Sequence, residues 1–166
     1  AKASGAMRTM VRLYHDVGGG SLLLPVGLRA TFAGMWAMAQ ASWAQGEPLR
    51  WTELPTPELR SGEILVKVQA IGVNPVDWKM RTRGPMRMAA RVLGPPPPVV
   101  FGVDFAGMVL AVAADVTTVK VGARVVGGTD FSRRQRGSYA DTVVVRPDQV
   151  VGVPDDLDIV VAGALP

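Results

Sequence analysis

Short apolar runs, separated by glycine and proline, constrain the fold of this chain more than any other feature. Four runs have the length and composition of β-strands: residues 63–70, 104–112, 121–126 and 138–145. Gly62 and Gly102 precede the first two runs, and Gly107 interrupts the second, as in a strand bent for barrel closure. The runs are regularly spaced, without intervening helices. This spacing predicts a small antiparallel β-barrel.

Length and composition exclude several classes of protein. The chain has 166 residues, close to the roughly 150 of one domain, which excludes a complete two-domain enzyme. It contains no cysteine, so a disulfide framework, an iron–sulfur cluster and a thiolate zinc site are excluded. The single histidine, His15, has no second ligand nearby and is expected to be a solvated side chain. We therefore expect no metal site.

Positive charge is concentrated in residues 1–34. This segment carries four basic side chains and one carboxylate, whereas residues 35–166 carry 14 basic and 13 acidic side chains. A nearly balanced remainder removes the main support for nucleic-acid binding, and no nucleic-acid partner is predicted. The segment resembles an organellar presequence, which suggests a mitochondrial location, with a cytoplasmic one otherwise. A cloning remnant or a disordered extension is the alternative. We place a folded domain at residues 35–166.

Residues 22–44 form an apolar window long enough to be considered as a membrane span. Arg29 is the only charge in it. Pro25, Gly27 and the central Arg29 make the window a poor candidate for insertion. We expect membrane contact to be indirect at most.

Three arginines recur with helical spacing in the middle of the chain. Arg83, Arg87 and Arg91 follow an i, i+4 pattern, and no acidic residue occurs from residue 78 to 103. One interpretation is a face that binds anions or docks a partner. We favour a solvated helical turn within a long loop, because surface arginine stripes are common.

Five ordered segments resemble one protein family. They are residues 72–79 (GVNPVDWK), 101–107 (FGVDFAG), 120–125 (KVGARV), 137–141 (GSYAD) and 162–166 (AGALP). Together they are similar to the N-terminal, GroES-like half of the medium-chain dehydrogenase/reductase superfamily, on its quinone-oxidoreductase branch. The resemblance implies a mainly β fold, a partly open antiparallel barrel with short helices, and no Rossmann domain.

The resemblance also bears on metal and cofactor. Zinc-dependent alcohol dehydrogenases of this superfamily carry a cysteine where this chain has Asn74, and a His-Glu pair where it has Val103 and Asp104. Those replacements imply a metal-free branch. In such reductases hydride passes directly from NADPH to a quinone, an enone or a related electrophile.

Four residues match family positions beside the nicotinamide and the substrate. An amide at Asn74 and a carboxylate at Asp77 can bind ribose or polar substrate groups, and Lys79 could add a cation. The alternative is local structure, in which Asn74 and Pro75 form a turn and Asp77 caps a helix. Tyr139 matches an aromatic near the family's cleft, although a tyrosine in a strand is more often half-buried packing. No catalytic residue is assigned.

The nucleotide-binding signature of the family is missing from the sequence. No G-x-G-x-x-G follows a strand, and the chain stops where the family's helix into its nucleotide-binding domain begins. We therefore expect no cofactor in this chain, and NADPH only if a nucleotide-binding domain is supplied elsewhere. Open sheet edges also predict a protein partner, either that domain or another subunit of a large assembly.

Two functions follow, and whether the chain is an enzyme stays open. The first is a non-catalytic accessory subunit of a larger assembly, such as a mitochondrial respiratory complex, and on this interpretation the chain alone is inactive. The alternative is the substrate-side half of a zinc-independent, NADPH-dependent quinone or enone oxidoreductase.

Overall fold

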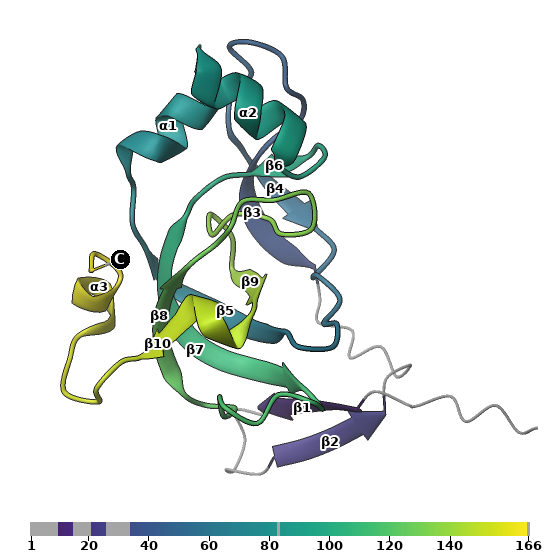
Figure 1. Cartoon of the computed structure of the whole chain (residues 1–166), viewed down its shortest axis with the longest axis vertical. Helices are drawn as coiled ribbons and strands as arrows, with labels where there is room; N and C mark the ends of the chain where they lie inside the picture. The colour runs from purple at the N-terminus through teal and green to yellow at the C-terminus, as the bar shows by residue number, and fades with distance from the viewer. Residues whose placement is uncertain (1–9, 15–20, 26–33, 83, 166) are drawn as a thin grey trace, which may run out of the picture.

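The computed structural model describes residues 10–14, 21–25, 34–82 and 84–165. His15 and Arg83 lie outside these residues. The described part of the chain forms two antiparallel sheets that do not close into a complete barrel (Figure 1). The mainly β, partly open architecture expected from the resemblance is confirmed.

The larger sheet is organised around one long, bent strand. Its seven strands are β1 (Met10–Tyr14), β2 (Ser21–Pro25), β5 (Ile64–Ile71), β7 (Asp104–Ala113), β8 (Arg124–Gly128), β9 (Thr142–Val145) and β10 (Val150–Gly152). Strand β7 pairs with β5, β8 and β1, and the path ends at β10 on one side and β2 on the other. A Cβ atom at Gly107 would lie 2.0 Å from the carbonyl oxygen of Lys67, so only glycine allows β5 and β7 to approach this closely.

The smaller sheet has the order β4 (Arg50–Leu54), β3 (Met35–Gln40) and β6 (Val99–Val100). Strand β3 shows why this segment is extended: Met35, Ala37 and Ala39 alternate inward on one face and are 3% exposed or less. The backbone N–H of Met38 donates to the carbonyl of Tyr139 at 2.8 Å, which joins this sheet to the segment that precedes β9.

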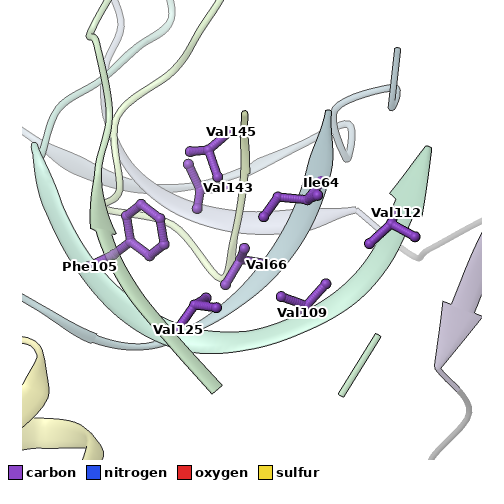
Figure 2. Packing of buried hydrophobic residues seen from close by; sticks show 8 residues of the cluster. All are labelled: Ile64, Val66, Phe105, Val109, Val112, Val125, Val143 and Val145. Atoms are coloured by element: carbon purple, nitrogen blue, oxygen red, sulfur yellow. The ribbon is translucent and has the colours of Figure 1, made fainter. Parts of the chain in front are cut away.

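The main core lies on the concave side of the larger sheet. Figure 2 shows its eight side chains, contributed by four strands and pointing toward one another: Ile64, Val66, Phe105, Val109, Val112, Val125, Val143 and Val145. All are at most 3% exposed. Six of the eight are valine, a β-branched residue that packs well on a pleated surface, so the same residues that favour strands also fill the core.

Two short helices, of the kind that the resemblance implies, lie between β5 and β6, although the spacing of the strands alone predicted none. They are α1 (Pro75–Arg81) and α2 (Pro85–Leu93), each with proline at its first position. A second core attaches them to the smaller sheet, with Phe101 stacked on Phe131 at 5.4 Å between ring centroids. The remaining helical segments are the 3-10 turn η1 (Pro147–Gln149) and α3 (Ile159–Ala162).

The predicted arginine stripe is helical but not uniformly solvated. Arg87 and Arg91 lie on α2, and Arg91 is exposed. The Arg87 guanidinium instead donates to the backbone carbonyl of Trp43, and its Nε is buried without a hydrogen-bond partner. The expectation of a solvated turn is therefore wrong for Arg87. Among the described residues no helix is long and apolar enough to cross a membrane.

Candidate functional site

A cleft of about 480 Å³ lies between α1, the end of β5, the smaller sheet and residues 138–141. Its walls are mainly apolar, and large side chains on them remain accessible. Trp51 is 59% exposed, Trp78 53% and Val73 75%. This volume falls within the usual range for small-molecule sites. The cleft is therefore suited to a ligand with a largely apolar body.

Asp77 is the buried carboxylate of the cleft lining, and the start of α1 places it there. Asn74 is the N-cap of the helix, with φ −115° and ψ 159°, and its backbone N–H donates to Asp77 Oδ2 at 2.7 Å. Asp77 is only 3% exposed. The predicted capping role of Asp77 is confirmed, since its carboxylate satisfies an N–H that the helix leaves unpaired. Contact of Asp77 with a cofactor or substrate stays a prediction.

Asn74 connects Asp77 to a second carboxylate. Its side-chain amide donates to Asp104 Oδ2, across thirty positions of sequence. Gly72 makes room for this contact, because a Cβ atom there would lie 3.0 Å from Asp104 Cβ. The positions that the resemblance equates with zinc ligands thus contact each other through a hydrogen bond. Among the described residues no group of three histidine, cysteine, aspartate or glutamate side chains is placed to hold a metal ion.

Tyr139 is a second polar residue of the cleft lining. Its ring packs against Gly102, and its backbone N–H donates to the carbonyl of Phe101 at 2.9 Å. The Tyr139 hydroxyl and Asp77 Oδ1 are both buried, and neither makes a hydrogen bond of standard geometry. Burial, followed by the negative charge of Asp77, raises the pKa of the Tyr139 phenol far above its ordinary value. The phenol is therefore neutral at physiological pH.

Three of the four predicted site residues lie at or beside the cleft, and the fourth does not line it. Asp77 and Tyr139 line the cleft, and Asn74 lies next to it, with its backbone N–H donating to the Asp77 carboxylate. Lys79 is exposed, with its Nζ 5.8 Å from the ring centroid of Trp78, and does not line the cleft. Arg81 does line it.

Sequence reasoning missed Arg81 and the two tryptophans of the cleft. Arg81 follows Asp77 by four positions, and this helical spacing places both on one face of α1, a signal that was available. The Arg81 guanidinium lies 5.8 Å from the ring centroid of Phe101, and its Nε donates to Gln40 Oε1 at 3.4 Å. Trp51 has no such signal, because its place depends on the packing of β4 against distant segments.

The fold agrees with a known domain family. The profile of the alcohol dehydrogenase GroES-like domain matches residues 60–155, more than half of the chain. The chain belongs to the GroES-like domains of the medium-chain dehydrogenase/reductase superfamily. The matched residues include α1, β7 and residues 137–141 of this chain.

Individual relatives are reductases. The domain is 37% identical over 125 residues to the trans-enoyl reductase mycC of Thermothelomyces thermophilus, covering 70% of this chain and 31% of that protein. It is 33% identical to lovC of Aspergillus terreus, the enoyl reductase component of lovastatin nonaketide synthase, covering 70% of this chain and 30% of lovC. The quinone oxidoreductase from Coxiella burnetii is similar in structure, with a TM-score of 0.69 and 30% identity over 80% of this chain and 41% of that one.

The GroES-like domain spans about a third of the length of these curated reductases. The relatives thus comprise enoyl reductases and quinone oxidoreductases, both of which the quinone-oxidoreductase resemblance anticipated.

Proposed function

We propose that this GroES-like domain is the substrate-side domain of a zinc-independent, NAD(P)H-dependent reductase of carbon–carbon double bonds conjugated to a carbonyl. The observation that carries the proposal is the cleft, an accessible apolar cavity whose lining includes a buried carboxylate, a neutral phenol and an arginine. Similarity to enoyl reductases and to quinone oxidoreductases supports it, because enoyl groups and quinones share this conjugated bond.

The apolar wall and the polar groups have separate tasks in such a reduction. Trp51, Trp78 and Val73 hold the hydrocarbon part of the substrate and exclude water from it. Arg81 is the cation of the lining, positioned to stabilise the negative charge that forms on the carbonyl oxygen when the β-carbon is reduced. The neutral Tyr139 hydroxyl keeps a proton in the cleft across the physiological range.

A reduced nicotinamide would supply the hydride when bound. The Asn74 N–H on Oδ2 fixes the Asp77 carboxylate next to the Tyr139 phenol, and the negative charge of the carboxylate helps to keep that phenol protonated.

The accessory-subunit interpretation has less support than this proposal. None of the relatives reported above is described as a subunit of a respiratory complex. That assembly, the mitochondrial location and a partner on the sheet edges stay predictions.

Binding to the purified chain tests the proposal through its own tryptophans. A trans-2-octenoyl thioester is titrated while the fluorescence of the four tryptophans is followed, and saturable quenching is expected. Trp51→Ala should weaken binding by about tenfold, since it removes a large apolar contact. Val73→Ala should weaken it less. The matched control Val151→Ala, on β10 and 71% exposed against 75% for Val73, should leave the Kd unchanged.

Turnover is then measured as NADPH oxidation by the full gene product, with the octenoyl thioester and with a benzoquinone. Arg81→Gln should lower kcat more than it raises KM, because the charge it stabilises develops during the reaction. Absence of saturable binding, or equal Kd changes for Val73→Ala and Val151→Ala, would refute the proposal.

A further inference from the structure

Helix α2 exposes its apolar side chains rather than burying them. Met86, Met88, Val92 and Leu93 are 45, 62, 55 and 64% exposed, and Ala90 is the residue of the helix that is buried. A helix packed on one side normally turns its large apolar residues inward. Grouped exposed apolar residues on a folded domain mark a surface that contacts something else.

Arginines without carboxylate partners border this apolar surface. Arg91 lies on α2 itself, and Arg133 is held against the end of the helix, with its Nε donating to the carbonyl of Val92 at 3.0 Å. Arg134 follows Arg133 in the same turn, which Ser132 and Gln135 close, and it is exposed. Both ion pairs found among the described residues belong to Arg146, so none of these three arginines is paired with an acidic side chain there. The surface therefore combines apolar side chains with uncompensated positive charge.

We propose that this α2 face, defined as Met86, Met88, Val92 and Leu93 with Arg91, Arg133 and Arg134, docks an acidic amphipathic helix of a partner protein. The positive charge of the α2 face favours a partner that carries negative charge. A second copy docked by two-fold symmetry would place arginines against arginines, which is unfavourable. Methionine and arginine are both enriched in protein interfaces. The exposed α2 residues also lack the Trp or Phe that anchors many helices in a membrane interface.

The α2 face is separate from the cleft, so this inference goes beyond the proposed function. No residue of α2 lines the cleft, whereas α1 contributes Asp77, Trp78 and Arg81 to it. Figure 1 shows α1 and α2 side by side at the end of the molecule opposite β1 and β2. A partner bound to α2 would lie next to the helix that carries three cleft residues.

The experiment uses two synthetic peptides and the full chain. Both peptides place leucine on one helical face, and the opposite face carries glutamate in one peptide and lysine in the other. Binding is followed by fluorescence anisotropy of the labelled peptides. The chain should bind the glutamate peptide at least about tenfold more tightly than the lysine peptide, and added salt should weaken binding.

Variants locate the contact. Arg134→Glu, in a loop, and Met88→Ser, on the helix, should each weaken binding of the glutamate peptide by about fivefold or more. The control Lys120→Glu reverses an exposed charge in the loop after β7 and should have no effect. Circular dichroism checks that each variant is folded, and the loop position of Arg134 keeps the test independent of α2 stability.

Three outcomes would overturn the proposal. One is equal binding of the two peptides, and a second is an equal loss of affinity with Lys120→Glu. The third is binding to anionic phosphatidylglycerol vesicles that exceeds peptide binding and is lost with Arg134→Glu, which would assign the α2 face to a lipid surface. Because the octenoyl thioester binds in the cleft, its titration is unaffected by any of these results.

Discussion

Gly102 is the position where one added methyl group should both destabilise the domain and disturb the cleft. Its φ is +99°, a region that residues with a side chain rarely adopt. A Cβ atom there would lie 2.4 Å from Tyr139 Cδ1 and 2.5 Å from Ser138 Oγ. Ser138 is fully buried, and its hydroxyl donates to the carbonyl of Asp104 at 2.8 Å. Neither neighbour can move without losing contacts.

The loss in the free energy of unfolding caused by Gly102→Ala has two contributions, one from the backbone and one from packing. The left-handed backbone costs about 1–3 kcal/mol for alanine, offset by about 0.4–1 kcal/mol because alanine restricts the unfolded chain. The steric conflict adds about 1–3 kcal/mol. Gly84 provides the control, since its φ is +100° and no atom lies within 4 Å of its Cβ position. Gly84→Ala pays the backbone cost alone, so Gly102→Ala should be the less stable of the two by about 1–3 kcal/mol.

Urea unfolding followed by tryptophan fluorescence measures this difference. We expect Gly102→Ala to unfold at a lower urea concentration than Gly84→Ala, with a similar dependence on urea. The octenoyl thioester should also bind more weakly to Gly102→Ala, because the added methyl group displaces the Tyr139 ring toward the cleft. Equal unfolding free energies for the two variants would refute the packing argument, whatever the effect on binding.

Three further predictions concern single contacts. Arg124 donates to the carbonyls of Pro154, Asp155 and Leu157 at 2.5 to 2.9 Å, so Arg124→Ala should lower the free energy of unfolding in urea by about 1–3 kcal/mol. It should also speed cleavage before Asp155, Asp156 or Asp158 by an endoproteinase specific for aspartate. Because the pKa of Tyr139 is raised in the folded state, the unfolded state loses its phenol proton first as the pH rises above about 10. The free energy of unfolding therefore falls with rising pH. Tyr139→Phe should make that fall less steep in a series of unfolding experiments at alkaline pH. A hydrogen bond from Ser61 Oγ at 2.5 Å lowers the pKa of Asp115, so Ser61→Ala should raise that pKa in an NMR titration, whereas Ser132→Ala should not.

Four strands of this domain could be predicted because their apolar runs are flanked by glycine or proline, whereas β3 and β4 were not predicted. The run at 63–70 became β5 (Ile64–Ile71), and the run at 104–112 became β7 (Asp104–Ala113). Segment 138–145 was predicted less well, since only Thr142–Val145 is a strand. The preceding residues are not part of the strand, because the backbone N–H groups of Ser138 and Tyr139 donate to the carbonyls of Gly102 and Phe101 instead.

The candidate site could be predicted in part, since residue types indicate chemistry but not distance. Asn74, Pro75 and Asp77 fall within four positions, so their local arrangement at a helix start was foreseeable. The meeting of Asp77 with Tyr139 was not, because it depends on how α1 packs against a loop more than sixty positions later. The partly buried position of the Arg87 side chain could not be predicted either, since its partner is a backbone carbonyl, which any residue could supply.

Strand β7 shares one of its edges between two different neighbours. Strand β8 pairs with residues 104–108, and β1 pairs only with Ala111, Val112 and Ala113. The hairpin of β1 and β2 thus pairs with the rest of the sheet over a very short stretch, whereas β5 pairs with β7 along nearly its whole length. Detaching the hairpin would uncover three backbone positions, too few to template a long intermolecular strand. Of the three strands that pair with β7, β1 is therefore the one with the fewest backbone pairings to lose.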